Sequence, residues 1–195
     1  KVAKMLGLGY PGGPALAAMA DQAYSKWPIA NSKNQGHTPY AISHMPALPR
    51  PMLNSKDYDF SFSGLKTAVM YFLKGINAPQ PPLNIRGCVG ELLPALCAEV
   101  QNAIVEVLVT KTVRAASEYG VKTVMLGGGV AANNHLREEL GKALSSQLPT
   151  ITYTLVPKPY TTDNAAMIAA AGYFYAKANK FVSWKDLRVD ANLSL

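Results

Sequence analysis

The sequence predicts an α/β protein, and two observations support this fold class. Between about residues 89 and 119, apolar side chains repeat at the 3-4 spacing of a buried helix face. Beyond this stretch, two short apolar runs, Val124–Leu126 and Thr152–Val156, have the length and composition of strands and are separated by a helical pattern. Strands that alternate with helices favour layers of helix packed on sheet.

The first 82 residues are expected to hold short helices joined by irregular structure. Val2–Leu6 form an apolar stripe that runs into Gly7, a common helix stop, so we expect this helix to begin upstream of the chain. Alternating aromatic and polar residues at Tyr58–Phe62 indicate a half-buried strand. The other expected elements are a turn at Tyr10–Pro14, a helix at Ala15–Tyr24, an irregular segment at 26–57 with a short strand near Tyr40–Ile42, a helix at Gly64–Lys74 and a loop at Gly75–Pro82.

The rest of the chain is predicted to start with a long helix at Val89–Tyr119, which Gly120 ends. Pro94 fits such a helix only in its first turn or at a kink. After the strand at Val124–Leu126, Gly127–Gly129 turn into a helix. The later elements are that helix at Asn133–Ser146, the strand at Thr152–Val156, a loop at Lys158–Thr162 and a small-residue helix at Asp163–Ala178.

Composition limits the class of protein. Apolar residues make up 49% of the 195, which excludes a disordered chain. The formal net charge of +7 favours an anionic partner such as nucleic acid or nucleotide phosphate, although the basic residues are scattered. The charged fraction of 16% is below the usual share of about a quarter. Either part of the surface packs against another lobe, or the core is rich in alanine and the loops in glycine and proline.

The cysteines, the apolar runs and the first residues of the chain bear on its cellular location. Cys88 and Cys97 would point to opposite faces of one helix, so we expect two reduced thiols in a cytoplasm-like compartment. We expect no transmembrane helix, since no uninterrupted apolar run reaches about 18 residues. The first residues have no secretory signal pattern.

Two segments could bind a nucleotide through glycine backbone. Gly127–Gly129 stand at a strand-to-helix turn, where N–H groups and the helix end could approach a phosphate. The turn lacks the Gly-Lys-Ser/Thr of a P-loop and the third glycine of the dinucleotide fingerprint, so a plain tight turn is the alternative. Asn133 has the alternative role of a helix N-cap. Gly12-Gly13-Pro14 could cradle a ribose or base, or form only a turn.

Asp163 is the candidate metal ligand. A carboxylate at the start of a helix caps free N–H groups and suits the helix dipole, but it could also hold a metal beside bound phosphate. Ser61–Thr67 is only loosely similar to a nucleophile elbow. His37, His44 and His135 have no metal-type spacing, so surface or capping roles are expected for them.

Five segments nevertheless follow one another in the order of a known family. They are Lys1–Pro14 (Lys-Val-Ala-Lys-Met-Leu-Gly-Leu-Gly-Tyr-Pro-Gly-Gly-Pro), Leu48–Pro51 (Leu-Pro-Arg-Pro), Asp59–Ala68 (Asp-Phe-Ser-Phe-Ser-Gly-Leu-Lys-Thr-Ala), Gly128–Arg137 (Gly-Gly-Val-Ala-Ala-Asn-Asn-His-Leu-Arg) and Thr162–Ala169 (Thr-Asp-Asn-Ala-Ala-Met-Ile-Ala). With these segments the chain resembles the C-terminal part of the TsaD family, also called Gcp or glycoprotease.

The resemblance implies an actin-like ATPase (ASKHA) fold of two RNase-H-like lobes, of which this chain would form mostly the second. Residues 1–120 would be its helical, insert-rich part and 121–195 its strand-helix part. The implied enzyme is a tRNA threonylcarbamoyltransferase, an acyltransferase. It moves the threonylcarbamoyl group from threonylcarbamoyl-adenylate to the exocyclic amine of the tRNA adenosine beside the anticodon. tRNA, a TsaB-like paralogue and a small ATPase would be its partners, in the cytoplasm and without a membrane.

The resemblance also implies roles for single residues. Asp163 matches a ligand of one divalent ion, iron or zinc, which two histidines of a His-x-x-x-His motif also hold. Gly13 and Asn133 match positions that contact the adenylate, or ATP or ADP as nucleotide ligand. Gly12 belongs to the same first motif, and Gly128 and Gly129 would form the turn on the phosphate side. No catalytic residue is assigned in this chain.

The chain departs from the family pattern in several places. The His-x-x-x-His lobe is absent, as is the Asp that precedes Lys1 in relatives. Ala17 stands where many relatives have an acidic residue, Thr161 replaces a common Cys and Leu48 replaces Phe. We therefore expect the isolated chain to bind metal and adenylate poorly and to transfer nothing.

Three other functions are alternatives to this enzyme. A metalloprotease would need a His pair or His-Glu-x-x-His, which the sequence lacks. A carbamoyl or sugar kinase of the actin-like class would show ATP turnover with a small acceptor. A non-catalytic paralogue subunit would lack both Thr-Asp-Asn and Gly-Gly-Val, and this chain has both.

Overall fold

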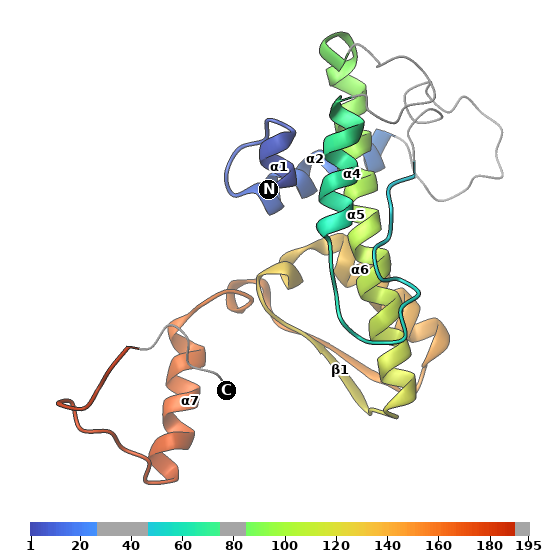
Figure 1. Cartoon of the computed structure of the whole chain (residues 1–195). Helices are drawn as coiled ribbons and strands as arrows, with labels where there is room; N and C mark the ends of the chain where they lie inside the picture. The colour runs from blue at the N-terminus through green and yellow to red at the C-terminus, as the bar shows by residue number, and fades with distance from the viewer. Residues whose placement is uncertain (27–46, 75–84, 190–195) are drawn as a thin grey trace.

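A computed structural model describes residues 1–26, 47–74 and 85–189 (Figure 1). It confirms the α/β class, because helices cover a parallel pair of strands. The elements are α1 (Val2–Met5), α2 (Gly12–Lys26), α4 (Ser63–Lys74), α5 (Ile85–Glu118), β1 (Thr123–Leu126), the 3-10 turn η1 (Gly129–Ala132), α6 (Asn134–Gln147), β2 (Thr152–Leu155), the 3-10 turn η2 (Lys158–Tyr160) and α7 (Ala165–Lys177). The strand expected near Tyr40–Ile42 and the loop at Gly75–Pro82 both lie outside the described residues.

Helix α5 is the axis of the fold. Helices α2, α4 and α6 all pack against it, and Figure 1 shows it running the length of the body. It begins at Ile85, before the predicted start, so Pro94 lies inside the helix and leaves one carbonyl, that of Gly90, without its usual donor. Gly120 ends the helix as predicted, with a φ of 58° that favours glycine.

One part of α5, Leu92–Glu118, is long and apolar enough to cross a membrane by length and composition alone. In its most apolar window, 61% of the residues are buried inside the fold. The central helix of a packed core gives the same signal, because it is covered on several sides.

Three clusters of buried side chains form the core. The largest packs Leu48 and two residues of α4, Leu65 and Val69, against α5. A second packs small residues of α2 against Cys97 and Ala98. Burial raises the pKa of the Cys97 thiol to about 11, so this cysteine is an apolar packing group rather than a nucleophile. The side chain of Cys88 lies outside the described residues. The third cluster, Val113, Leu140 and Leu144, connects α5 to α6 across residue 120, and the division proposed at that point stays a prediction.

The two strands lie parallel, with Thr123 opposite Thr152 and Leu126 opposite Leu155. Helix α6 connects them and covers one face, where Leu140 and Leu144 pack on Val124, Leu126 and Tyr153. The helix approaches closely at Gly141, where a Cβ would lie only 3.3 Å from the ring of Tyr153. Both strands therefore depend on α6 for burial.

Residues 47–62, here called the strap, run along α5 (Figure 1). The strand predicted at Tyr58–Phe62 is wrong, since the structure gives these residues no ladder partner. Side chains fix the strap instead. Leu48 is buried in the largest core cluster, and its N–H donates to Glu99 at 2.9 Å. Arg50 donates to Glu99 and, at 2.8 Å, to Glu106, and both carboxylates project from α5. The Arg in the Leu-Pro-Arg-Pro segment therefore has a structural explanation.

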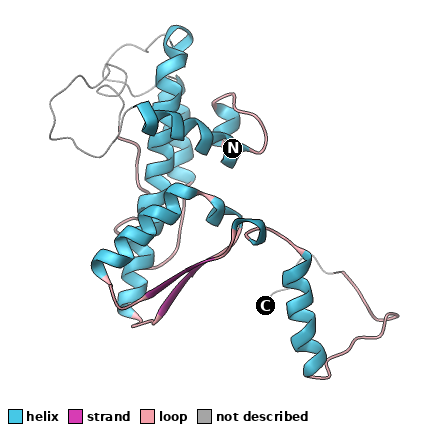
Figure 2. Cartoon of the chain, turned by 180° about the vertical axis from the view of Figure 1, so that it is seen from behind, coloured by secondary structure: helices cyan, strands magenta, loops and turns pink. Residues whose placement is uncertain are grey.

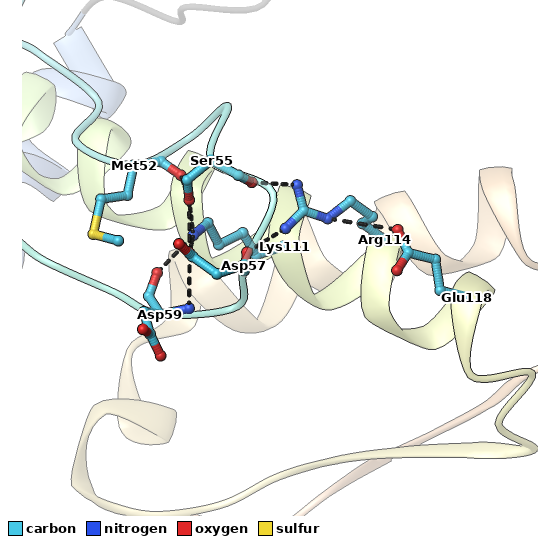
Figure 3. A network of polar contacts seen from close by, with 7 residues as sticks. All are labelled: Met52, Ser55, Asp57, Asp59, Lys111, Arg114 and Glu118. Carbon is cyan, nitrogen blue, oxygen red and sulfur yellow. Dashed lines mark hydrogen bonds and ion pairs between the residues drawn. The ribbon is translucent and has the colours of Figure 1, made fainter.

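Lys111 fixes the other end of the strap (Figure 3). Its side chain is 1% exposed, and its ammonium group donates to Ser55 Oγ at 2.8 Å and to the Asp59 carbonyl at 2.6 Å. It also pairs with Asp57 at 3.3 Å. The hydrogen bond from Ser55, together with Lys111, lowers the pKa of the Asp57 carboxyl. A buried ammonium needs this full set of acceptors, so Lys111 determines where the strap lies.

Helix α7 differs from the others because none of its residues is buried. Figure 2 shows it standing away from α5 and from the strands. It begins at Ala165 with Asn164 as N-cap, whose Oδ1 accepts from Met167 N at 3.0 Å. The predicted helix at Asp163–Ala178 is thus confirmed as an element, but Asp163 lies outside it.

We expect Lys111→Met to lower the free energy of unfolding by about 3 kcal/mol, because it leaves three strap acceptors without their donor. Urea unfolding followed by far-UV circular dichroism measures this. The control, Lys56→Met, changes an exposed lysine of the same strap and should have little effect. Equal effects of the two variants would contradict the anchoring role.

Candidate functional site

The glycine turn after β1 and the loop after β2 that leads to Thr-Asp-Asn meet at one edge of the sheet. Gly127–Gly129 follow β1 and residues 156–163 follow β2, and the carboxyl ends of parallel strands lie at the same edge. A Cβ placed on Gly127 would lie 3.7 Å from Val156, and one on Gly129 would lie 3.8 Å from Thr162. The fold therefore brings together two motifs that are about thirty residues apart in the sequence.

The glycine turn has a backbone that requires glycine at one position. Gly128 has a φ of 83°, which side chains rarely tolerate, and the space around its Cα is open. The turn leads into η1, not directly into α6 as the sequence suggested. This single short turn separates the glycines from the first residue of α6. A phosphate at the glycines would therefore meet backbone N–H groups rather than the dipole of a long helix.

Arg137 holds this edge together. From α6 its guanidinium donates to the Ala131 carbonyl in η1 and, at 2.7 Å, to the Val156 carbonyl at the end of β2. The rigid fork of a guanidinium can bind two carbonyls at once. The last residue of the Gly128–Arg137 motif thus fixes the spacing between the two loops.

Asn133 is the N-cap of α6, as predicted, and it makes a second contact that the sequence did not reveal. Its Oδ1 accepts from Leu136 N at 2.9 Å, and its Nδ2 donates to Gln101 Oε1 at 2.7 Å. Gln101 belongs to α5 and is 4% exposed. One side chain therefore joins the start of α6 to the axis of the fold.

The contact continues to α2 through aromatic and amide groups. Tyr24 stacks on His135 with 4.9 Å between ring centroids, and both rings hydrogen-bond to Asn102 Oδ1, at 2.8 and 2.9 Å. Burial raises the pKa of Tyr24 to about 12 and lowers the pKa of His135. His135 is half-buried in this network, so the predicted surface or capping role leaves out its contacts with Tyr24 and Asn102.

The structure gives the two glycines of the first motif different surroundings. A Cβ on Gly12 would lie 2.8 Å from Cβ of Ala3, so Gly12 is required for close packing of α1 on α2. Gly13 is exposed and faces open space. It lies eleven residues before Tyr24 on α2, about 16 Å along the axis. The network at Tyr24 therefore does not bring Gly13 next to Asn133.

Asp163 is exposed between η2 and α7. Because Asn164 caps α7, the capping role considered for Asp163 is wrong. Within the described ranges, no three His, Cys, Asp or Glu side chains gather as metal ligands would. These residues alone do not fit an iron or zinc site, which needs several ligands in defined geometry.

None of the hydrogen bonds described for Ser61–Thr67 activates a hydroxyl of this segment as a nucleophile. The Thr67 hydroxyl donates to the Ser63 carbonyl one helical turn earlier, and the imidazole of His135 contacts Asn102 and Tyr24. This segment serves as the start of α4 and the end of the strap.

Comparison with known proteins identifies the family. The family model for tRNA N6-adenosine threonylcarbamoyltransferase, TsaD, matches residues 1–170. The chain belongs to the TsaD family. This membership implies the actin-like fold, and the α/β arrangement agrees with it; which lobe the chain forms stays a prediction.

Curated proteins named tRNA N6-adenosine threonylcarbamoyltransferase are similar over most of this TsaD-family chain. The protein from Enterococcus faecalis is 41% identical over 186 residues, 94% of this chain and 45% of the relative. The Bacillus subtilis protein is 44% identical over 173 residues, 88% of this chain and 42% of the relative. The Geobacillus kaustophilus protein is 42% identical over 196 residues, all of this chain and 48% of the relative. The chain thus spans a little under half the length of these relatives.

Arg137→Met should lower the free energy of unfolding by about 2 kcal/mol, because two carbonyl groups lose a charged donor. Amide hydrogen exchange in residues 127–133 and 156–163 should become faster than in α5. The matched control is Glu138→Gln, an exposed neighbour on α6, which should leave exchange at this edge unchanged. If exchange rises equally everywhere, Arg137 does not act at this edge.

The raised pKa of Tyr24 predicts a pH dependence. The folded state favours the neutral phenol, so this contribution to stability is complete below pH 10 and is lost as the pH rises towards 12. The difference in unfolding free energy between the wild type and Tyr24→Phe should therefore shrink across this range. Urea unfolding at a series of pH values measures it. A difference that grows with pH would contradict the assignment.

Proposed function

We propose that the protein is a tRNA threonylcarbamoyltransferase, and that this chain forms part of its substrate site. The carbonyl carbon of threonylcarbamoyl-adenylate forms a bond to the exocyclic nitrogen of an adenosine beside the anticodon. Its bond to the phosphate oxygen breaks, AMP leaves, and the amine loses a proton. The observation that carries the proposal is the meeting of the glycine turn with the Thr-Asp-Asn segment at the carboxyl edge of parallel strands.

Each predicted residue has a role in this proposal. Backbone N–H groups of Gly128 and Gly129 bind the phosphate of the adenylate, where the open space at Gly128 leaves room for it. Asn133 offers a fixed amide to the nucleoside part. Gly13 lets the adenylate approach the start of α2, and Gly12 acts through the packing of α1 against that helix.

Asp163 is proposed as one ligand of the divalent iron or zinc ion expected for the family. Its exposed position beside the loop at Thr162 supports this. The other ligands must come from outside the described residues. When bound, such an ion would act as a Lewis acid; the chain's own groups bind and orient the adenylate.

Partners and location follow from the same proposal. The net charge of +7 suits tRNA, and the family description names a tRNA adenosine as substrate. A TsaB-like paralogue and a small ATPase are proposed as protein partners, in the cytoplasm. The isolated chain, which carries one proposed metal ligand, is expected to transfer nothing by itself.

The test uses the longer protein that includes the His-x-x-x-His part. With labelled threonylcarbamoyl-adenylate and tRNA, the wild type should label the tRNA. Asn133→Ala should lower kcat/KM by about 10- to 100-fold, since it removes a partly buried, oriented amide. Asp163→Ala should abolish transfer. The matched controls are Asn134→Ala and Asp186→Ala, both exposed, which should keep wild-type rates.

Two results would contradict the proposal. The first is no labelled tRNA from the longer protein, even with the paralogue and ATPase present. The second is ATP turnover with a small acceptor, which would favour the actin-like kinases instead.

A further inference from the structure

The amide of Asn133 is held at both ends. Its Oδ1 accepts from Leu136 N, and its Nδ2 donates to Gln101 Oε1. An Asn side chain can turn by half a revolution at little cost when its surroundings do not distinguish oxygen from nitrogen. Here the turned amide would set its nitrogen against a backbone N–H and its oxygen against another oxygen. The contacts therefore select one orientation.

The orientation of Gln101 is in turn set from α2 and α6. Gln101 Nε2 donates to the Tyr24 hydroxyl at 3.3 Å, and that hydroxyl gives its own proton to Asn102 Oδ1. Because Asn102 Oδ1 is an acceptor, Nε2 of His135 must be the donor in their contact at 2.9 Å. Each hydrogen bond in this series therefore has one assignment of donor and acceptor, and the series connects Asn102 through Tyr24 and Gln101 to Asn133.

These directions determine what Asn133 can offer a ligand. One Nδ2 hydrogen and one lone pair of Oδ1 are used inside the protein. The other hydrogen and the other lone pair are left in fixed positions, and Asn133 is only partly buried. A donor and an acceptor side by side match the edge of a nucleoside, through its base or its ribose hydroxyls.

We propose that Gln101 is a positioning residue for the adenylate, which it does not itself need to touch. It holds the Asn133 amide in the orientation that binds the nucleoside. This proposal rests on the proposed function for the identity of the nucleotide. The buried position of Gln101, which is 4% exposed, is then explained by the hydrogen bond that it accepts from Asn133.

The test measures AMP affinity by calorimetry and transfer kinetics in the longer protein. Gln101→Met, of similar length, removes both polar atoms and should weaken AMP binding about tenfold, because the amide of Asn133 is no longer oriented. The KM for threonylcarbamoyl-adenylate should rise in parallel, with kcat at saturation within about threefold. Gln101→Glu keeps an acceptor for Nδ2 and should retain affinity within about threefold.

A double-mutant cycle separates positioning from general damage. If Gln101 acts through Asn133, Gln101→Met should have no further effect on AMP binding in an Asn133→Ala background. The matched control is Val100→Ala, at the buried apolar residue next to Gln101 on α5, which removes packing but leaves the hydrogen bonds of Gln101 and Asn133 in place. It should lower stability while AMP affinity stays within about twofold.

Losses that add in the cycle would overturn the proposal, as would equal effects of Gln101→Met and Val100→Ala on AMP affinity. If Gln101→Met does not fold, Tyr24→Phe replaces it in the cycle, because it removes the group that orients the Gln101 amide and keeps the ring that stacks on His135. A wild type that binds AMP but transfers nothing would overturn only the proposed function. A wild type that does not bind AMP would overturn both.

Discussion

Polar groups on α5 that leave water must find partners on other elements, and this constraint places most of the chain. A buried polar group without a partner costs about 1–3 kcal/mol, and a buried charge costs more. Along α5, Glu99 and Glu106 meet Arg50, Gln101 meets Asn133, and Lys111 meets the acceptors of the strap. The apolar clusters bring the helices together, but these bonds specify which residue lies opposite which.

The same constraint explains why sequence motifs of different kinds lie where they do. Arg50 acts as a tie to α5, and Arg137 joins the loops after the two strands. Neither residue has to contact a substrate to be required. In this chain, therefore, the charged residues of these two motifs are explained by contacts within the fold.

The sequence was a good guide where the chain follows a local rule. Gly120 ended α5, Asn133 capped α6, and the two strands lay within a residue of their predicted bounds, because capping and apolar periodicity act over a few residues. Tyr58–Phe62 was wrongly predicted as a strand, because aromatic and polar residues can alternate both in a strand and in an extended segment that side chains hold in place. The start of α5 was predicted four residues late, at Val89, and Pro94, expected in the first turn or at a kink, lies inside the helix.

Of the candidate site, the sequence located the loops and the cap but not the groups that orient them. The pairing of Gly129 with Thr162 follows from parallel strands, whose order could be inferred. Gln101, Tyr24 and Arg137 could not be found in that way, since their partners are distant in the sequence. A glutamine at a buried position of an apolar helix is the one signal that could have pointed to such a bond.

Helix α7 has a practical consequence for handling the protein. Its exposed face carries Met167, Ile168, Tyr173, Phe174 and Tyr175, and exposed apolar residues continue in the segment after it. Surfaces of this kind bring molecules together at high concentration. All three core clusters and the network around Asn133 lie before Ala165. A chain that ends before Ala165 would keep its buried core and lose the exposed apolar residues of α7. Its solubility could therefore be changed without changing its core.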